Sequence, residues 1–121
     1  MIGGVAETRS EYALTPRDSH VNVVTLTGAL VAPAELRYSP AGIPIARFLL
    51  EHFSEQSEAG AHRPVRLRIG VRASGQPLAE ALQGVSAGTC LRVVGFLIRS
   101  RQRSGEYPLI ISASQIERLA S

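Results

Sequence analysis

The part of the chain best supplied with anion-binding groups is the short region from residue 99 to residue 105. It places Arg99, Arg101 and Arg103 between two strand-like runs, TCLRVVGFLI and EYPLIISASQI. This pattern predicts a β-hairpin that holds guanidinium groups out from a rigid sheet. Guanidinium donors match phosphate and carboxylate oxygens, so the hairpin favours a polyanionic ligand. The alternative is a charged loop tip that only faces water.

Positive charge is unevenly distributed along the chain. The sequence has no lysine, and all 13 of its basic residues are arginine. Residues 59–105 contain eight arginines and one acidic residue, Glu80, whereas residues 1–20 carry a net charge of −1. A nearly neutral body with one strongly basic region indicates a polyanionic partner, nucleic acid first and a membrane surface second.

The residue types that enzymes and metal sites need are sparse. His20, His52 and His62 are too scattered for metal-ligand spacing, and the one cysteine, Cys90, lies in an apolar run typical of a core. The chain has no lysine-containing phosphate loop, no apolar run of about 18 residues and no signal-peptide pattern at its start. We therefore expect a cytoplasmic binding protein with no catalytic residue, no cofactor, no metal and no membrane association.

The length of 121 residues is enough for one domain with its own core. Residues 1–20 mix charge, glycine and proline, so we expect a flexible N-terminal extension there and a folded domain over residues 21–121. Turn signals and β-rich runs predict five strands, with one helix between the third and the fourth. The expected strands are residues 21–31, 43–53, 65–73, 89–98 and 107–119, the helix is 78–83, a polar loop is 54–62, and residues 32–36 are a loop or short edge segment.

The clearest periodicity is in the third expected strand. Apolar residues at positions 65, 67, 69, 71 and 73 alternate with Arg66, Arg68, Gly70 and Arg72. A period of two predicts a half-buried strand with a core face and a basic face. Residues two apart on a strand are about 6–7 Å apart, so the guanidinium groups would form a row suited to the phosphates of a nucleic-acid strand.

Five short strands with one helix between the third and the fourth is the layout of the OB-fold, an all-β, five-stranded Greek-key barrel. Gly28 fits this fold, since it predicts a bulge or bend in a long first strand that serves both halves of the barrel. OB-folds bind oligonucleotides on strands two and three and on the loops joining strands one to two and four to five. In this chain those places carry Arg37, Arg47, Arg66, Arg68, Arg101 and Arg103.

Two other functions are compatible with such a barrel. Its basic face could meet an acidic protein surface, which would make it a protein-interaction module with weak nucleic-acid binding. It could also bind RNA, although the sequence lacks the aromatic-rich strands that RNA-binding OB-folds use.

Several short motifs also resemble a known family. They are SPAGIP at residues 39–44, FLLEH at 48–52, EAGAHR at 58–63, VGF at 94–96 and SQIE at 114–117. Together they resemble the primosomal replication protein N (PriB) family, relatives of single-stranded DNA-binding protein. The resemblance implies a homodimeric OB-fold that binds single-stranded DNA and contacts the PriA helicase and, in some bacteria, DnaT. These proteins restart stalled replication forks.

The resemblance also implies individual site residues. The family's basic positions fall on Arg37, Arg63, Arg101 and Arg103, whereas a further basic position falls near Pro108. Family members can carry aromatic residues where this chain has Ala61 and Arg66, so base stacking would depend on Arg66 or on other aromatic residues. Phe53 and Tyr107 are the candidates, and either could equally be a core or interface residue. The expected nucleic-acid site comprises Arg37, Arg47, Arg63, Arg66, Arg68, Arg99, Arg101 and Arg103.

Overall fold

The computed structural model describes residues 20–100 and 108–120. The expected N-terminal extension lies outside these residues except for His20. The described chain forms six strands and one helix: β1 (Val24–Leu30), β2 (Glu35–Tyr38), β3 (Pro44–Glu58), β4 (Ala61–Ser74), α1 (Gln76–Glu80), β5 (Cys90–Arg99) and β6 (Leu109–Arg118). Within this part of the chain, no helix has the length and apolar character needed to cross a membrane.

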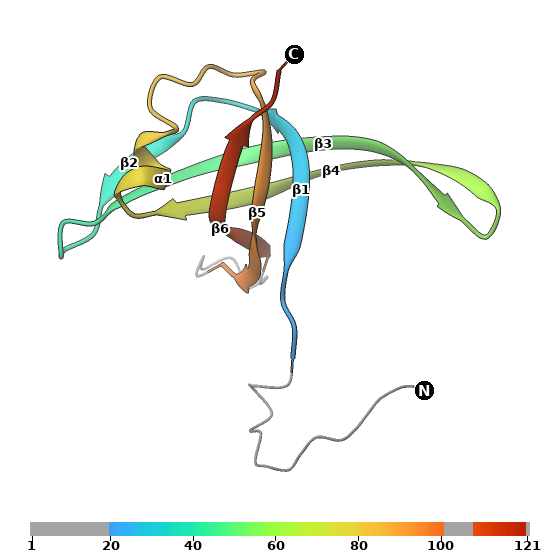
Figure 1. Ribbon diagram of the computed structural model, residues 1–121, viewed down its shortest axis with the longest axis horizontal. Helices are drawn as coiled ribbons and strands as arrows, with labels where there is room; N and C mark the ends of the chain where they lie inside the picture. Colours follow the sequence, from blue (N-terminus) through green and yellow to red (C-terminus); the bar gives the residue numbers. More distant parts are fainter. Residues whose placement is uncertain (1–19, 101–107, 121) are drawn as a thin grey trace, which may run out of the picture.

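The strands form a closed barrel (Figure 1). Their order is β1-β5-β6-β4-β3-β2, and a further pairing of β1 with β3 closes the sheet. β2 pairs only along the edge of β3, so five strands make the barrel and β2 is the short edge segment. The expected OB-fold is confirmed, including the helix between β4 and β5.

Alternate residues of the strands point into the barrel and form its core. Leu30, Leu50, Leu91, Val93 and Ile111 are the largest of the fully buried side chains. The helix is shorter than expected and starts earlier, because Pro77 lies in its first turn and residues 81–84 already form turns. Its Ala79 is buried against the core, and so are Leu82 in the turns that follow and Val85 just after them.

The expected polar loop at residues 54–62 is wrong, because β3 and β4 continue through it as one long hairpin. Their register is unbroken from Ile45 opposite Ser74 to Glu58 opposite Ala61. The chain reverses at Ala59 and Gly60, which both have positive φ angles, as a two-residue hairpin turn requires. The hairpin extends past β1 on one side of the barrel (Figure 1). Its end is exposed to water on both faces, so polar residues there are compatible with strand structure.

The apolar side of β4 is only partly a core face. Val71 and Ala73 are buried, but Leu67 is 37% exposed. The alternation of residues along β4 is therefore as expected. The apolar side chains are buried only within the barrel, because no other layer of the described protein covers β4 beyond it.

Gly28 lies where β1 passes from one neighbour to another. β1 pairs with β5 as far as Ala29, and pairs with β3 at Ala29 and Leu30. A Cβ atom at residue 28 would collide with the carbonyl oxygen of Glu51, so only glycine allows β3 to approach this closely. The register irregularity of the barrel lies elsewhere, between Val94 and Gly95 of β5.

Candidate nucleic-acid interface

The side of β3 and β4 that points away from the core carries most of the expected site. Directly opposed residues of two strands lie on the same face, and Phe48 opposite Val71 belongs to the buried face. The alternate pairs therefore form what we call the outer face. Its four central pairs are Arg47 with Arg72, Leu49 with Gly70, Glu51 with Arg68, and Phe53 with Arg66.

Phe53 and Arg66 form a stacked pair on this face. The guanidinium carbon of Arg66 lies 5.0 Å from the centre of the Phe53 ring, which is within cation–π range. The Phe53 side chain remains accessible to a ligand, since the residue is 62% exposed. The pair thus offers a flat, partly apolar surface beside a positive charge, which is the combination that stacks on a nucleobase. The candidate role of Phe53 in the core is excluded by this exposure.

Glu51 organises the two arginines beside it. Its carboxylate lies 3.0 Å from Arg68 Nε and 3.8 Å from an Arg66 terminal nitrogen. Arg68 donates a hydrogen bond to this carboxylate. The Glu51 side chain is only 20% exposed, whereas the two arginine side chains are 52% and 71% exposed. The guanidinium groups therefore share one anchored acid and still face the solvent.

Arg47 and Arg72 lie at the other end of the outer face, where β2 also joins it. Arg47 is opposite Arg72 on one side and opposite Glu35 of β2 on the other. By the same alternation Arg37 lies on this face too, and it is 3.9 Å from Glu35. The sequence places Arg72 on the basic side of the third expected strand, but the expected site does not include it. The alternation of residues 65–73 is the signal that identifies it.

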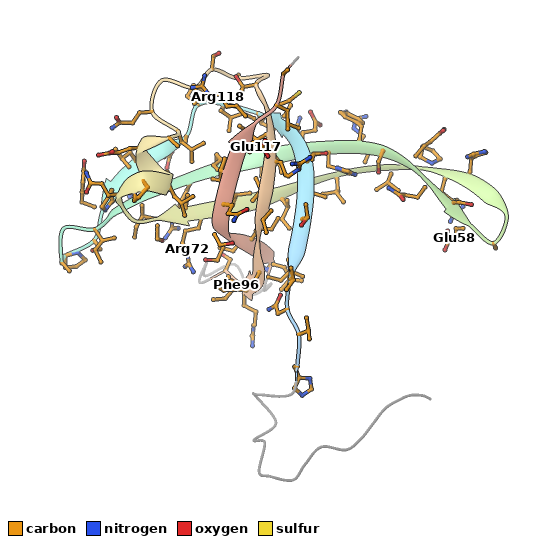
Figure 2. The ribbon with its side chains drawn as sticks, viewed as in Figure 1. Glu58, Arg72, Phe96, Glu117 and Arg118 are labelled. Atoms are coloured by element: carbon orange, nitrogen blue, oxygen red, sulfur yellow. The ribbon has the colours of Figure 1, made fainter. Side chains whose placement is uncertain are left out.

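Arg63 does not lie with the other arginines of β4. It is opposite Gln56, on the face of the hairpin that continues the core side. Its Nε donates a hydrogen bond of 2.8 Å to the Glu58 carboxylate near the tip of the hairpin, where Figure 2 labels Glu58. The structure thus separates Arg63 from Arg66 and Arg68.

The basic loop between β5 and β6 is described only at its ends. Arg99 is the exposed last residue of β5 and is opposite Leu109. Arg101, Arg103 and Tyr107 lie outside the described residues, so their roles remain predictions. Ser100 and Pro108 begin and end the loop, and they are joined by a backbone hydrogen bond of 2.9 Å.

His52 and Cys90 occupy positions typical of residues that stabilise the fold. One ring nitrogen of His52, Nδ1, lies 2.7 Å from the Thr27 carbonyl oxygen and the other lies 2.7 Å from Ser54 Oγ, which ties β3 to β1. Cys90 is a half-buried free thiol at the start of β5. Over residues 20–100 and 108–120, no cluster of three or more His, Cys, Asp or Glu side chains could hold a metal ion.

A closed five-stranded barrel with arginines and an exposed stacked pair on two adjacent strands defines an OB-fold protein with a basic outer face. Similar folds are found among solved structures. The protein PriB from Ralstonia solanacearum is 32% identical, with a TM-score of 0.70 over 83% of this chain and all of that chain. The single-stranded DNA-binding protein of Plasmodium falciparum, solved with single-stranded DNA, has a TM-score of 0.72 at 14% identity and supports the fold alone.

Sequence comparison identifies the family. Residues 22–113 match the family described as "Another single-strand binding protein family". The replication restart protein PriB of Erwinia tasmaniensis is 38% identical over 100 residues, which cover 83% of this chain and 95% of that protein. The chain belongs to this single-strand binding protein family, and within it to the group of replication restart protein PriB.

Proposed function

We propose that this chain binds single-stranded DNA along the outer face of β3 and β4 and acts as a non-enzymatic component of replication restart in the cytoplasm. The observation that carries the proposal is the stacked Phe53–Arg66 pair in line with Arg68, Arg47 and Arg72 on one exposed face. The names of its relatives, replication restart and single-strand binding proteins, support the same role.

The outer face suits a single strand because it joins two kinds of contact. The arginines can bind phosphates, which are present in every sequence, and the Phe53–Arg66 pair can stack on any base. Neither contact reads a base edge, so binding should depend steeply on salt and little on sequence. This stack replaces the aromatic residues that family members can carry where this chain has Ala61 and Arg66.

The expected arginines outside β3 and β4 would lengthen the surface along which the DNA strand binds. Arg37 lies beside the outer face on β2, and Arg99, Arg101 and Arg103 belong to the region that joins β5 to β6. Arg63 would be reached only by a strand that passes around the edge of the hairpin, because it lies on the opposite face.

Fluorescence anisotropy with a labelled oligo-dT across a salt series tests the proposal. We expect saturable binding at low salt and a logarithm of the affinity that falls linearly with the logarithm of salt concentration. A labelled oligonucleotide of mixed sequence should bind similarly, and the matched duplex should bind more weakly. Undetectable binding at low salt, or binding insensitive to salt, would refute the proposal.

The proposal includes a homodimer formed along β1. Asn22 Nδ2 donates a hydrogen bond of 2.8 Å to the Leu97 carbonyl oxygen, and the Leu97 N–H donates one of 2.9 Å to Asn22 Oδ1. These bonds hold the segment before β1 against β5. In the described chain, the other edge of β1 pairs with β3 only at Ala29 and Leu30. Val21 and Val23 are 89% and 70% exposed beside this edge. A second copy would cover both the apolar side chains and the open strand edge.

The proposal also includes a contact with the PriA helicase and, where it occurs, with DnaT. The membership of the chain in the PriB group supports this contact. Adding purified PriA to a labelled complex of this protein with oligo-dT should raise the anisotropy further and in proportion to PriA bound. An unchanged signal, together with unchanged mass in sedimentation, would remove the helicase from the proposal.

A further inference from the structure

Arg47 and Arg72 lie directly opposite each other, and neither has an acidic partner in the described part of the chain. Directly opposed residues of antiparallel strands have Cβ atoms about 4.5–5.5 Å apart, and like charges at such positions are destabilising. Neither residue forms an ion pair or a side-chain hydrogen bond with residues 20–100 or 108–120. Glu35 is the acid nearest in register, but its ion pair is with Arg37. Within the described residues, the repulsion between the two guanidinium groups is therefore uncompensated.

Arg72 also holds an unsatisfied donor. Its Nε atom is buried and has no hydrogen-bond partner. A buried donor without a partner destabilises the folded protein, because it has lost its hydrogen bond to water. Arg72 lies between β3 and β6, opposite Arg47 on one side and Ser112 on the other, and neither neighbour supplies an acceptor. An acceptor from outside the chain would remove this cost.

An open pocket of about 400 Å³ lies at this pair of arginines. The polar residues that line it are Arg47, Arg72, Glu35 and Ser100. Its apolar lining includes Leu49 and Ile110. Gly70 contributes no side chain, and a Cβ atom there would be 3.1 Å from Ile110 Cγ2. The pocket combines two guanidinium groups with an apolar lining and one carboxylate, that of Glu35, which is paired with Arg37. It is larger than a lone phosphate needs.

We propose that this pocket is a subsite for one backbone phosphate of the bound single strand, with the attached sugar against Leu49 and Ile110. A phosphodiester has two non-bridging oxygens, so it can accept charge-assisted hydrogen bonds from both arginines at once. It offsets the repulsion between the two guanidinium groups, and a small turn of the Arg72 side chain brings its buried Nε atom to a phosphate oxygen. The subsite rests on the proposed function and deepens it, because Arg47 and Arg72 become a single unit that holds one phosphate.

One DNA strand can reach both the phosphate subsite and the stacked Phe53–Arg66 pair, because both lie on the outer face of β3 and β4. Arg47 and Phe53 are six residues apart on β3, which corresponds to about 20 Å. Several nucleotides are needed to span this distance. One strand can therefore place a phosphate between Arg47 and Arg72 and a base on Phe53 and Arg66.

Variants Arg47→Gln, Arg72→Gln and the double variant test the subsite in the oligo-dT anisotropy assay. Arg118→Gln is the matched control, since it also removes one exposed charge but lies on the opposite side of the protein from Arg72 (Figure 2). We expect each single variant to bind about tenfold more weakly, as for one lost charged hydrogen bond. The double variant should bind only slightly more weakly than the singles and should lower the salt slope by about 0.7, the value for one phosphate.

The outcomes separate the subsite from the proposed function. If the unaltered protein does not bind oligo-dT, the proposed function fails. If it binds and the double variant behaves like Arg118→Gln, the subsite is wrong and the proposed function stands. Fully additive losses from the two arginines would mean that they hold different phosphates, which also overturns the shared subsite.

A direct measurement on Arg72 covers the case in which a variant is unstable. The Nε–Hε signal of Arg72 in a ¹⁵N-resolved NMR spectrum of the unaltered protein should shift on saturation with oligo-dT. An unchanged signal would overturn the proposal. Inorganic phosphate should shift the same signal only at far higher concentration. A full shift with phosphate and none with oligo-dT would assign the pocket to a free anion and exclude the strand.

Discussion

The guanidinium group of Arg66 lies over the ring of Phe53 across β3 and β4, with its central carbon 5.0 Å from the centre of the ring. The two residues come from strands that run in opposite directions, so their contact depends on the register of the long hairpin. It supplies an aromatic surface at a place where the residue on β4 is itself not aromatic.

Removing the Phe53 ring should weaken binding of single-stranded DNA without changing its salt dependence. A base stacked on an aromatic residue contributes about 1–3 kcal/mol, so Phe53→Ala should reduce affinity for oligo-dT by about 5- to 150-fold. Phe53→Leu should lose as much, whereas Phe53→Tyr should bind nearly as well as the unaltered protein. Equal affinities for the leucine and tyrosine variants would show that the ring does not stack on a base.

Neutralising Glu51 should strengthen binding. Glu51→Gln removes the only acid paired with Arg66 and Arg68 in the described chain, so both guanidinium groups gain freedom to bind phosphate. We expect tighter binding of oligo-dT at low salt and a steeper salt slope. Stability should change by about 1 kcal/mol or less, since the arginine side chains of both ion pairs are largely exposed. Weaker binding at every salt concentration would show that Glu51 mainly positions the arginines.

The double variant Arg101→Ala, Arg103→Ala tests the loop that the sequence first indicated. Loss of two phosphate contacts should weaken binding to all sequences alike and lower the salt slope by about 1.4, that is, about 0.7 for each contact. The measurement is the same anisotropy series with oligo-dT and a mixed sequence. Binding like that of the unaltered protein would leave the loop as a charged tip facing water.

A charge at Val23 should disrupt the proposed dimer. Val23 is 70% exposed in the single chain, so Val23→Lys should leave the barrel folded while placing a charge in the β1 interface. Sedimentation velocity should give the mass of two chains for the unaltered protein and of one chain for the variant. Circular dichroism and the melting curve serve as the check on folding. A single-chain mass for both proteins would remove the dimer.

The basic face of β4 could be predicted because alternation along one strand is a local property. Residues 66, 68 and 72 fall on one side of any regular strand, whatever the strand pairs with. The OB-fold followed from the order of the strands and the position of the helix. Neither inference required knowledge of which residues meet across the sheet.

The hairpin tip and the residue pairs could not be predicted in this way. Residues 54–62 are polar because both faces of the hairpin end are exposed, and polarity alone resembles a loop. A loop over these residues ends the predicted alternation before Arg63, so the sequence does not separate Arg63 from Arg66. The pairing of Phe53 with Arg66 and of Arg47 with Arg72 depends on a non-local register that the sequence does not display.

The long hairpin of β3 and β4 also links two surfaces thermodynamically. An isolated two-stranded ribbon is only marginally stable in water, and this one leaves the barrel with solvent on both sides. Whatever covers Leu67 on its inner side will reduce the fluctuations of Phe53 and Arg66 on its outer side. A partner that packs on Leu67 and a DNA strand that binds Phe53 and Arg66 should therefore favour each other reciprocally, even though they touch different side chains.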